Sequence, residues 1–152
     1  PGKTAEAEWF DSKGRRYIRT GDIGRFDADG FLVLTDRRKD MIISGGFNIY
    51  PSDLEAVLRR HPAVADAAVF GVPSAQWGET PVAAVVLRAP ETMGAGSASS
   101  SAAPDAQALR EWANAQLGKT QRISELRLVA ELPRSAIGKV LRRELREAWQ
   151  SG

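Results

Sequence analysis

Two apolar segments constrain the fold of this chain more than any other feature. Residues 63–72, AVADAAVFGV, and residues 80–89, TPVAAVVLRA, are dense in small and β-branched side chains. Such runs favour strands that are largely buried. The connection between them is short and carries Gln76, Trp77, Gly78 and Glu79. We therefore expect a buried pair of neighbouring strands, which needs helices to cover it.

Further strands are predicted on both sides of this pair. Residues 17–35 contain two apolar runs separated by DADG, which indicates a β-hairpin. MIIS at 41–44 and RISELRLVAEL at 122–132 are further strand candidates. The predicted fold class is α+β, with a small mixed sheet flanked by helices and preceded by a hairpin.

Three helices are predicted from apolar spacing and capping signals. The segment PSDLEAVLRRHP has Ser52 and Glu55 at capping-box spacing and ends at Pro62. Residues 105–117 form an amphipathic pattern with Asp105 as a cap, and residues 140–149 predict a closing helix. Residues 90–104, PETMGAGSASSSAAP, are of low complexity, so we expect a flexible loop there.

Composition excludes several classes of site. The chain has 152 residues, no cysteine and one histidine, which excludes thiolate sites and histidine clusters for metals. No apolar run approaches the roughly 20 residues that span a bilayer, and we expect a cytoplasmic protein. Its two basic clusters, 37–39 and 142–146, are interrupted by acidic residues. A nucleic-acid partner is therefore not expected.

Three segments, in this order and separation, resemble the adenylate-forming superfamily of acyl-CoA synthetases, luciferases and peptide-synthetase adenylation domains. They are YIRTGD at 17–22, DRRKDMIISGGFNIYPSDLE at 36–55 and LPRSAIGK at 132–139. HPAV at 61–64 and GVP at 71–73 add to the likeness, which extends over nearly the whole chain outside 90–104. The resemblance is nearest to fatty-acyl-CoA and related ligases.

The resemblance implies an acid–thiol ligase that works in two steps. A fatty or related carboxylic acid is first converted by ATP, with Mg²⁺, into an acyl-adenylate, and coenzyme A then displaces AMP. The resemblance also implies that residues 1–36 end a large N-terminal domain and that residues 37–152 form its C-terminal lid. The lid's partner would be its own N-terminal domain, and the fragment alone would be inactive, with no metal ligands of its own.

The resemblance assigns nucleotide contacts to two residues. Asp22 would accept hydrogen bonds from the ribose hydroxyls of ATP, because an ionised carboxylate offers acceptors only. Arg37 would reach the same ribose with donors. The alternatives are that Asp22 stabilises its own turn and that Arg37 forms a surface salt bridge.

The resemblance assigns one residue to domain movement and three residues to the side where coenzyme A enters. Lys39 falls at the family's hinge, although a solvated loop charge would have the same composition. Gly45, Gly46 and Asn48 would lie beside the pantetheine tunnel, where glycine permits close backbone approach; a plain tight turn is the alternative. Ile43 stands where some relatives have a second lysine, so this chain would rely on backbone contacts there.

Lys139 is the predicted catalytic residue. In the family, the lysine after this glycine enters the active site and stabilises negative charge between the carboxylate and the α-phosphate. A solvated charge at the start of a helix is the alternative. His61 is expected to be a charge at a helix end rather than a general base. Trp77, Trp112 and Trp149 are expected to be core or partly buried packing residues rather than stacking platforms.

Two other functions stay open at this level. One is a ligase that loads a carrier-protein pantetheine instead of free coenzyme A. The other is a non-catalytic binding module that keeps the same fold, against which the joint presence of Asp22, Arg37 and Lys139 argues.

Overall fold

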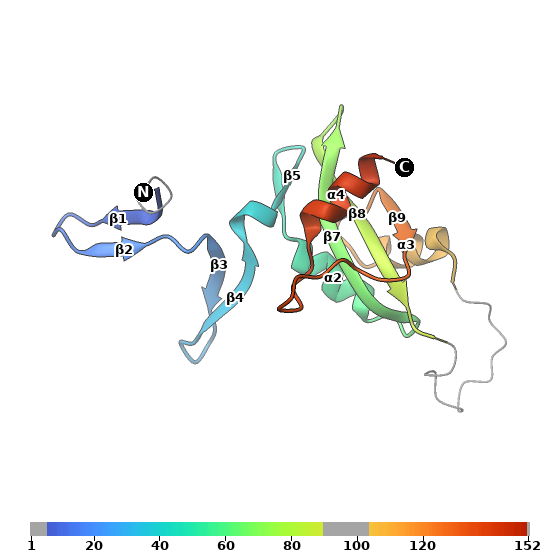
Figure 1. The fold of residues 1–152 in the computed structure, drawn as a ribbon, viewed down its shortest axis with the longest axis horizontal. Helices are drawn as coiled ribbons and strands as arrows, with labels where there is room; N and C mark the ends of the chain where they lie inside the picture. Colours follow the sequence, from blue (N-terminus) through green and yellow to red (C-terminus); the bar gives the residue numbers. More distant parts are fainter. Residues whose placement is uncertain (1–5, 90–103, 152) are drawn as a thin grey trace. The chain divides into compact units, whose positions relative to one another are not determined.

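A computed structural model describes residues 6–89 and 104–151, so the predicted flexible loop lies outside the described residues apart from Pro104 (Figure 1). The chain divides into two compact units between Lys39 and Asp40, whereas the boundary predicted from the sequence lies after residue 36. The two units are described separately. Within the described ranges, no helix is both long enough and apolar enough to span a membrane.

The first unit consists of two antiparallel hairpins. Strand β1 (Glu8–Phe10) pairs with β2 (Arg16–Ile18), and β3 (Asp22–Phe26) pairs with β4 (Leu32–Arg37). The DADG turn is closed by the Asp27 carboxylate, which accepts from the amides of Asp29 and Phe31. The predicted hairpin is therefore confirmed, while the β1–β2 hairpin is an addition to the predicted elements. The short 3₁₀ turn η1 (Arg38–Asp40) follows.

The second unit is built on a five-stranded mixed sheet with the order β6-β5-β8-β7, in which β9 also pairs with β8. The two longest strands are β7 (Val64–Ser74) and β8 (Gly78–Leu87), which are the two apolar segments of the sequence. Strands β5 (Ile42–Ser44), β6 (Phe47–Ile49) and β9 (Glu125–Leu128) complete the sheet. Only the β8–β9 pairing is parallel in this sheet of described residues.

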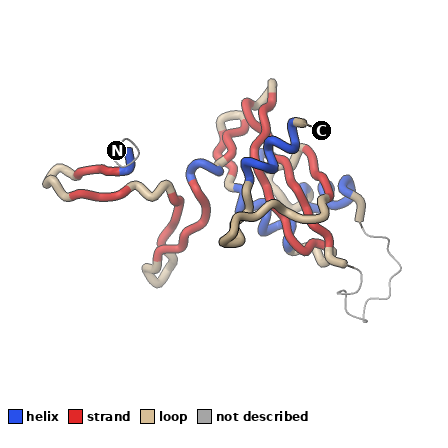
Figure 2. The backbone as a smooth tube through the Cα atoms, viewed as in Figure 1, coloured by secondary structure: helices blue, strands red, loops and turns tan. Residues whose placement is uncertain are grey.

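Helices cover both faces of the sheet, as expected for strands that are apolar on both sides (Figures 1 and 2). Odd-numbered side chains such as Val69 and Val85 pack with α2 (Pro51–Arg59) and α3 (Ala106–Asn114). On the other face, Phe70 and neighbouring even-numbered side chains pack with α4 (Arg142–Gln150). The 3₁₀ turn η3 (Lys119–Gln121) lies between α3 and β9.

The two predicted helix caps had opposite outcomes. The Asp105 carboxylate accepts from the Ala108 amide at 2.7 Å, so this cap is confirmed. The capping box of Ser52 and Glu55 is wrong, because α2 begins at Pro51 with Tyr50 as its N-cap. Proline is favoured at the first helical position because it lacks the amide hydrogen that would stay unpaired there. Glu55 is thereby available for a contact outside its own helix.

His61 follows the end of α2, as predicted, but its surroundings do not favour the charge expected there. Its Nδ1 atom accepts from the Ala63 amide at 3.2 Å, and its ring meets Trp112 edge-on. Burial lowers the pKa of His61, which favours the neutral ring. Trp112 and Trp149 are packed as expected, the latter against Phe70 and beneath the Arg127 guanidinium.

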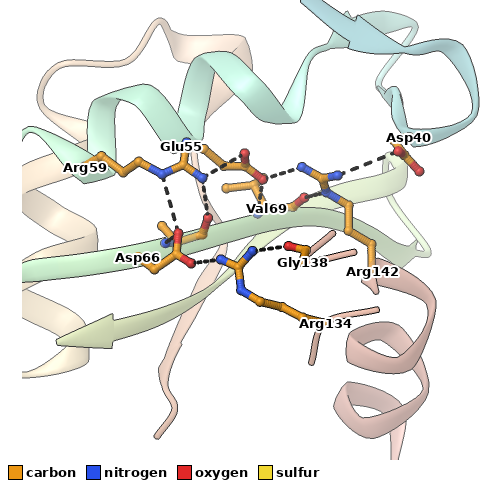
Figure 3. A network of polar contacts seen from close by, with 9 residues as sticks. Asp40, Glu55, Arg59, Asp66, Val69, Arg134, Gly138 and Arg142 are labelled. Atoms are coloured by element: carbon orange, nitrogen blue, oxygen red, sulfur yellow. Dashed lines mark hydrogen bonds and ion pairs between the residues drawn. The ribbon is translucent and has the colours of Figure 1, made fainter. Parts of the chain in front are cut away.

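The outer edge of β7 pairs with no further strand of the described sheet, and side chains satisfy its backbone instead (Figure 3). Glu55 Oε1 accepts from the Val69 amide at 3.0 Å, and Arg142 Nε donates to the Val69 carbonyl at 3.1 Å. Arg59 and Arg146 donate to the carbonyls of the next outward-facing residues, 67 and 71. Covering an edge in this way prevents pairing with a foreign strand.

Ion pairs join these side chains into one network. Arg142 Nη2 lies 2.6 Å from Glu55 Oε1, and its Nη1 lies 3.7 Å from Asp40 Oδ2. Arg59 Nη2 lies 3.4 Å from Glu55 Oε2. Glu55 is the one buried charged residue among those described. Its charge is therefore supported by partners from α2, β7 and α4.

Replacing Glu55 with glutamine should destabilise the second unit. The side chain keeps its size but loses the charge that compensates the largely buried Arg142 guanidinium, so we expect a loss of about 3 kcal/mol in unfolding free energy. Urea unfolding measures this loss. The control is Glu125→Gln, which breaks an exposed pair with Arg127 and should cost under about 1 kcal/mol. Equal effects of both substitutions would contradict the role given to Glu55.

Candidate functional site

Asp22 and Arg37 face each other across the β3–β4 hairpin. They are direct partners in the strand register, and Arg37 Nε lies 3.1 Å from Asp22 Oδ1. Both side chains are partly exposed, so each keeps hydrogen-bonding capacity toward solvent. A carboxylate beside a guanidinium presents acceptors and donors together, which suits a vicinal diol. The salt bridge that was the alternative for Arg37 exists, and it holds the pair in place.

A cationic pocket of about 420 Å³ lies next to this pair within the first unit. It is lined by Thr20, Gly21, Arg37, Arg38 and Lys39, and the Arg38 amide donates to the Gly21 carbonyl at 2.8 Å. Three positive side chains around one hollow favour an anionic group. The sequence analysis assigned no role to Arg38, although its place in the basic cluster was a usable signal.

The β5–β6 hairpin carries the two predicted glycines and Asn48. Gly45 and Gly46 have φ angles of 56° and 83°, which favour glycine. Gly45 also has a close neighbour, because a Cβ built on it would lie 2.9 Å from Trp77 Cε3. Asn48 is exposed and pairs with Ile43 across the hairpin. The three residues thus share one short loop and its exposed strand.

Residues from the β7–β8 turn hold this loop. The Gly45 amide donates to the Trp77 carbonyl at 2.9 Å, and the Ile43 amide donates to Glu79 Oε2 at 3.0 Å. These two bonds extend a strand pairing that otherwise consists of Ser44 opposite Gly78. The loop with Gly45 and Gly46 is therefore fixed to the β7–β8 hairpin.

Trp77 lies outside the core, because the residue is 51% exposed. The indole packs over Gly45 and lines a pocket of about 290 Å³. Phe47 is another exposed aromatic residue at this pocket, and Lys119 and Arg122 supply two positive charges. The remaining lining residues are Ser44, Gly45, Thr80, Pro81, Thr120 and Ser124.

This pocket was missed by sequence reasoning because its parts come from three distant segments. An aromatic face offers stacking to a planar ring, and lysine and arginine bind phosphate. The combination suits a ligand with a heteroaromatic ring and phosphate groups.

Lys139 lies on a tight loop directly before α4. The Gly138 amide donates to the Ser135 carbonyl at 2.8 Å, and Gly138 has a φ of 78°. The Ser135 amide donates to the Lys139 carbonyl at 2.8 Å, and residues 134 and 140 form a β-bridge. Lys139 is exposed, and its ammonium forms no ion pair with the described residues. An exposed positive charge thus stands on a loop that is closed by its own hydrogen bonds.

Separate substitutions of Gly45 and Gly46 should show that Trp77 packs against Gly45. Gly45→Ala and Gly46→Ala each place a side chain at positive φ, at a cost of about 1 kcal/mol. Only Gly45→Ala adds a clash with the indole, so only this variant should move the Trp77 indole N–H resonance in an NMR spectrum. Equal shifts in both variants would contradict the contact.

The family model described as AMP-binding enzyme C-terminal domain matches residues 53–139 of this chain. A 2-succinylbenzoate–CoA ligase from Geobacillus kaustophilus is 46% identical over 127 residues, which cover 84% of this chain and 24% of that enzyme. The chain therefore spans about a quarter of the length of the relatives it matches.

Two solved structures extend the likeness to the fold. The ATP-bound crystal structure of MatB from Rhodopseudomonas palustris has a TM-score of 0.80 and 33% identity, covering 99% of this chain and 27% of that one. A fatty acyl-CoA synthetase from Mycobacterium tuberculosis has a TM-score of 0.70 and 36% identity, with the same coverages of 99% and 27%. The predicted α+β fold class is confirmed by these structures.

Proposed function

This chain belongs to the AMP-binding enzyme C-terminal domain family, and from that premise we propose that it is the lid of a longer, ATP-dependent, AMP-forming acyl-CoA ligase. The acid's oxygen attacks the α-phosphate of ATP, and the bond to pyrophosphate breaks. The thiol of coenzyme A then attacks the acyl carbon, and AMP leaves. We place this enzyme in the cytoplasm, where a chain without cysteine is at no disadvantage.

A fatty or related carboxylic acid is the proposed substrate. One relative is named for 2-succinylbenzoate and one solved structure for fatty acyl groups, so both kinds of acid fit the family. Mg²⁺ would accompany ATP and neutralise its phosphates. Its ligands are proposed to lie outside this chain, because the described residues hold no cluster of acidic or histidine side chains suited to a metal.

The observation that carries the proposal is the setting of Lys139. Its ammonium has no ion-pair partner in the described chain, and the loop beneath it is held by its own hydrogen bonds. An unpaired charge on a preorganised backbone is suited to stabilising negative charge as it develops. Lys139 is the proposed catalytic residue of the adenylation step.

The lid movement is proposed to take place at Lys39. The chain divides into its two units between this residue and Asp40. Changes in a few backbone angles between two rigid bodies are sufficient for domain rotation. In one orientation Lys139 would serve adenylation, and in the other the glycine loop would face the thiol. Asp22 and Arg37 are proposed to hold the ribose of ATP.

Free coenzyme A is the proposed acceptor rather than a carrier-bound pantetheine. The pocket beside Gly45 combines the exposed rings of Trp77 and Phe47 with the charges of Lys119 and Arg122. Coenzyme A carries an adenine ring and phosphate groups, whereas the pantetheine arm of a carrier protein lacks the adenine nucleotide. The pocket therefore favours the free cofactor.

Lys139→Ala in the full-length protein tests the catalytic assignment. We expect pyrophosphate release from ATP and the acid to fall at least 100-fold, because a charge aimed at the transition state is lost. Thioester formation from preformed acyl-adenylate and coenzyme A should stay within about threefold, since it needs the other lid orientation. Survival of both half-reactions would contradict the role of Lys139.

Arg122→Ala tests the acceptor. Losing one charged contact to phosphate, worth about 1.5 kcal/mol, should raise the KM for coenzyme A about tenfold and leave adenylation unchanged. Arg60→Ala, an exposed arginine at the end of α2, is the control and should change neither. An enzyme that is not saturated by free coenzyme A but accepts a pantetheinylated carrier protein would contradict the proposal.

A further inference from the structure

We propose that Arg134 and Asp66 are positioning residues for Lys139, an inference that rests on the catalytic role proposed for that lysine. Arg134 Nη1 donates to the Gly138 carbonyl, and its Nη2 pairs with Asp66 Oδ2 (Figure 3). One guanidinium thus joins the peptide before Lys139 to a carboxylate on β7. Its rigid fork suits it to bridging two acceptors at once.

The contact of Arg134 is made on the peptide group that sets the direction of the Lys139 side chain. The Gly138 carbonyl and the Lys139 amide belong to a single planar unit. Arg134 holds the oxygen of that unit, and Ser135 Oγ accepts from its nitrogen at 3.2 Å. The plane is therefore held from both sides. Because the Ser135 amide also donates to the Lys139 carbonyl at 2.8 Å, the backbone is held on both sides of the Lys139 Cα atom.

Asp66 is itself anchored to the sheet. Its Oδ1 atom accepts from the Ala67 amide at 2.8 Å and lies 3.6 Å from Arg59 Nε. Arg59 in turn donates to the Ala67 carbonyl at 2.9 Å and pairs with Glu55. Figure 3 shows this chain of contacts running from α2 across β7 to the lysine loop. The loop is thereby attached to β7, in which residues 67–71 are all buried.

The tip of the loop has little else to fix it. Ile137 is 88% exposed, and the other hydrogen bonds of residues 135–139 stay within the loop. Those bonds preserve the shape of the loop but do not set its direction relative to the sheet. Because the lysine stem carries its charge several bonds from Cα, a small tilt of the loop becomes a large displacement of the ammonium. A misplacement of about 1 Å can reduce a rate about 100-fold.

Arg134→Ala in the full-length protein tests this inference. We expect kcat of the adenylation half-reaction to fall 30- to 100-fold, roughly the loss for a displaced catalytic group, with KM for ATP and the acid within about threefold. Thioester formation from preformed acyl-adenylate should be unchanged. Arg134→Lys, which retains the pair with Asp66 but loses the fork, should recover part of kcat. Asp66→Asn should lower kcat as well.

Arg143→Ala is the matched control, since Arg143 is 84% exposed and pairs only with Glu147 of its own helix among the described residues. It should leave both half-reactions unchanged. As a readout without turnover, hydrogen exchange of the Gly138 and Lys139 amides should accelerate in Arg134→Ala, with the β7 and β8 amides unchanged. Equal losses in both half-reactions, or a normal adenylation kcat, would overturn the inference.

The two failures are distinguishable. If Lys139→Ala abolishes adenylation while Arg134→Ala has normal kcat, Lys139 keeps its role and Arg134 loses the positioning role. If Lys139→Ala itself adenylates normally, the proposed function fails, and the positioning role fails with it.

Discussion

The open edge of β7 is the constraint on which the second unit depends. Ala67, Val69 and Gly71 are buried, and their outward-facing backbone groups pair with no other described strand. An unpaired buried polar group costs about as much as a lost hydrogen bond. Glu55 and Arg142 supply the pairing at Val69, the middle of that edge. Because these two side chains come from α2 and α4, one ion pair sets the positions of helices on opposite faces of the sheet.

Residues at this edge also hold the neighbouring segments of the second unit in place. Arg142 begins α4 three residues after Lys139 and also approaches Asp40, the first residue of the second unit. The pair of Asp66 and Arg134 holds the loop that carries Lys139. The proposed hinge side and the proposed catalytic lysine are therefore tied to one rigid strand. A lid that moves as a single body needs this kind of internal stiffness.

Much of the fold follows from local pattern. The two apolar runs, the DADG turn and the Asp105 cap each have a signal confined to a few neighbouring residues, and each is present in the structure. Glu55 shows the limit of such reasoning, because its spacing from Ser52 predicts a cap while its carboxylate is used by a strand edge. The short strands β1 and β6 carry too few residues to form a pattern of their own.

The residues of the proposed site fall into the same two groups, those with a local sequence signal and those without one. Asp22, Arg37, Gly45 and Lys139 were predicted as site residues from motifs, which are contiguous in sequence. The pocket at Trp77 and the bridge of Arg134 were not, since their parts meet only after folding: Trp77 with Arg122, and Arg134 with Asp66. From its sequence, Trp77 resembles a core residue. In the structure its indole packs against Gly45, where the absence of a side chain leaves room for the ring.

A crystal structure of the full-length protein with a non-hydrolysable acyl-adenylate analogue is the most direct test of the account. We predict that Lys139 Nζ lies within about 3.2 Å of an oxygen of the α-phosphate or of the acyl group. We also predict that Arg134 still bridges the Gly138 carbonyl and Asp66. A lid closed over the nucleotide with Lys139 in solvent, and another cation at the phosphate, would contradict it.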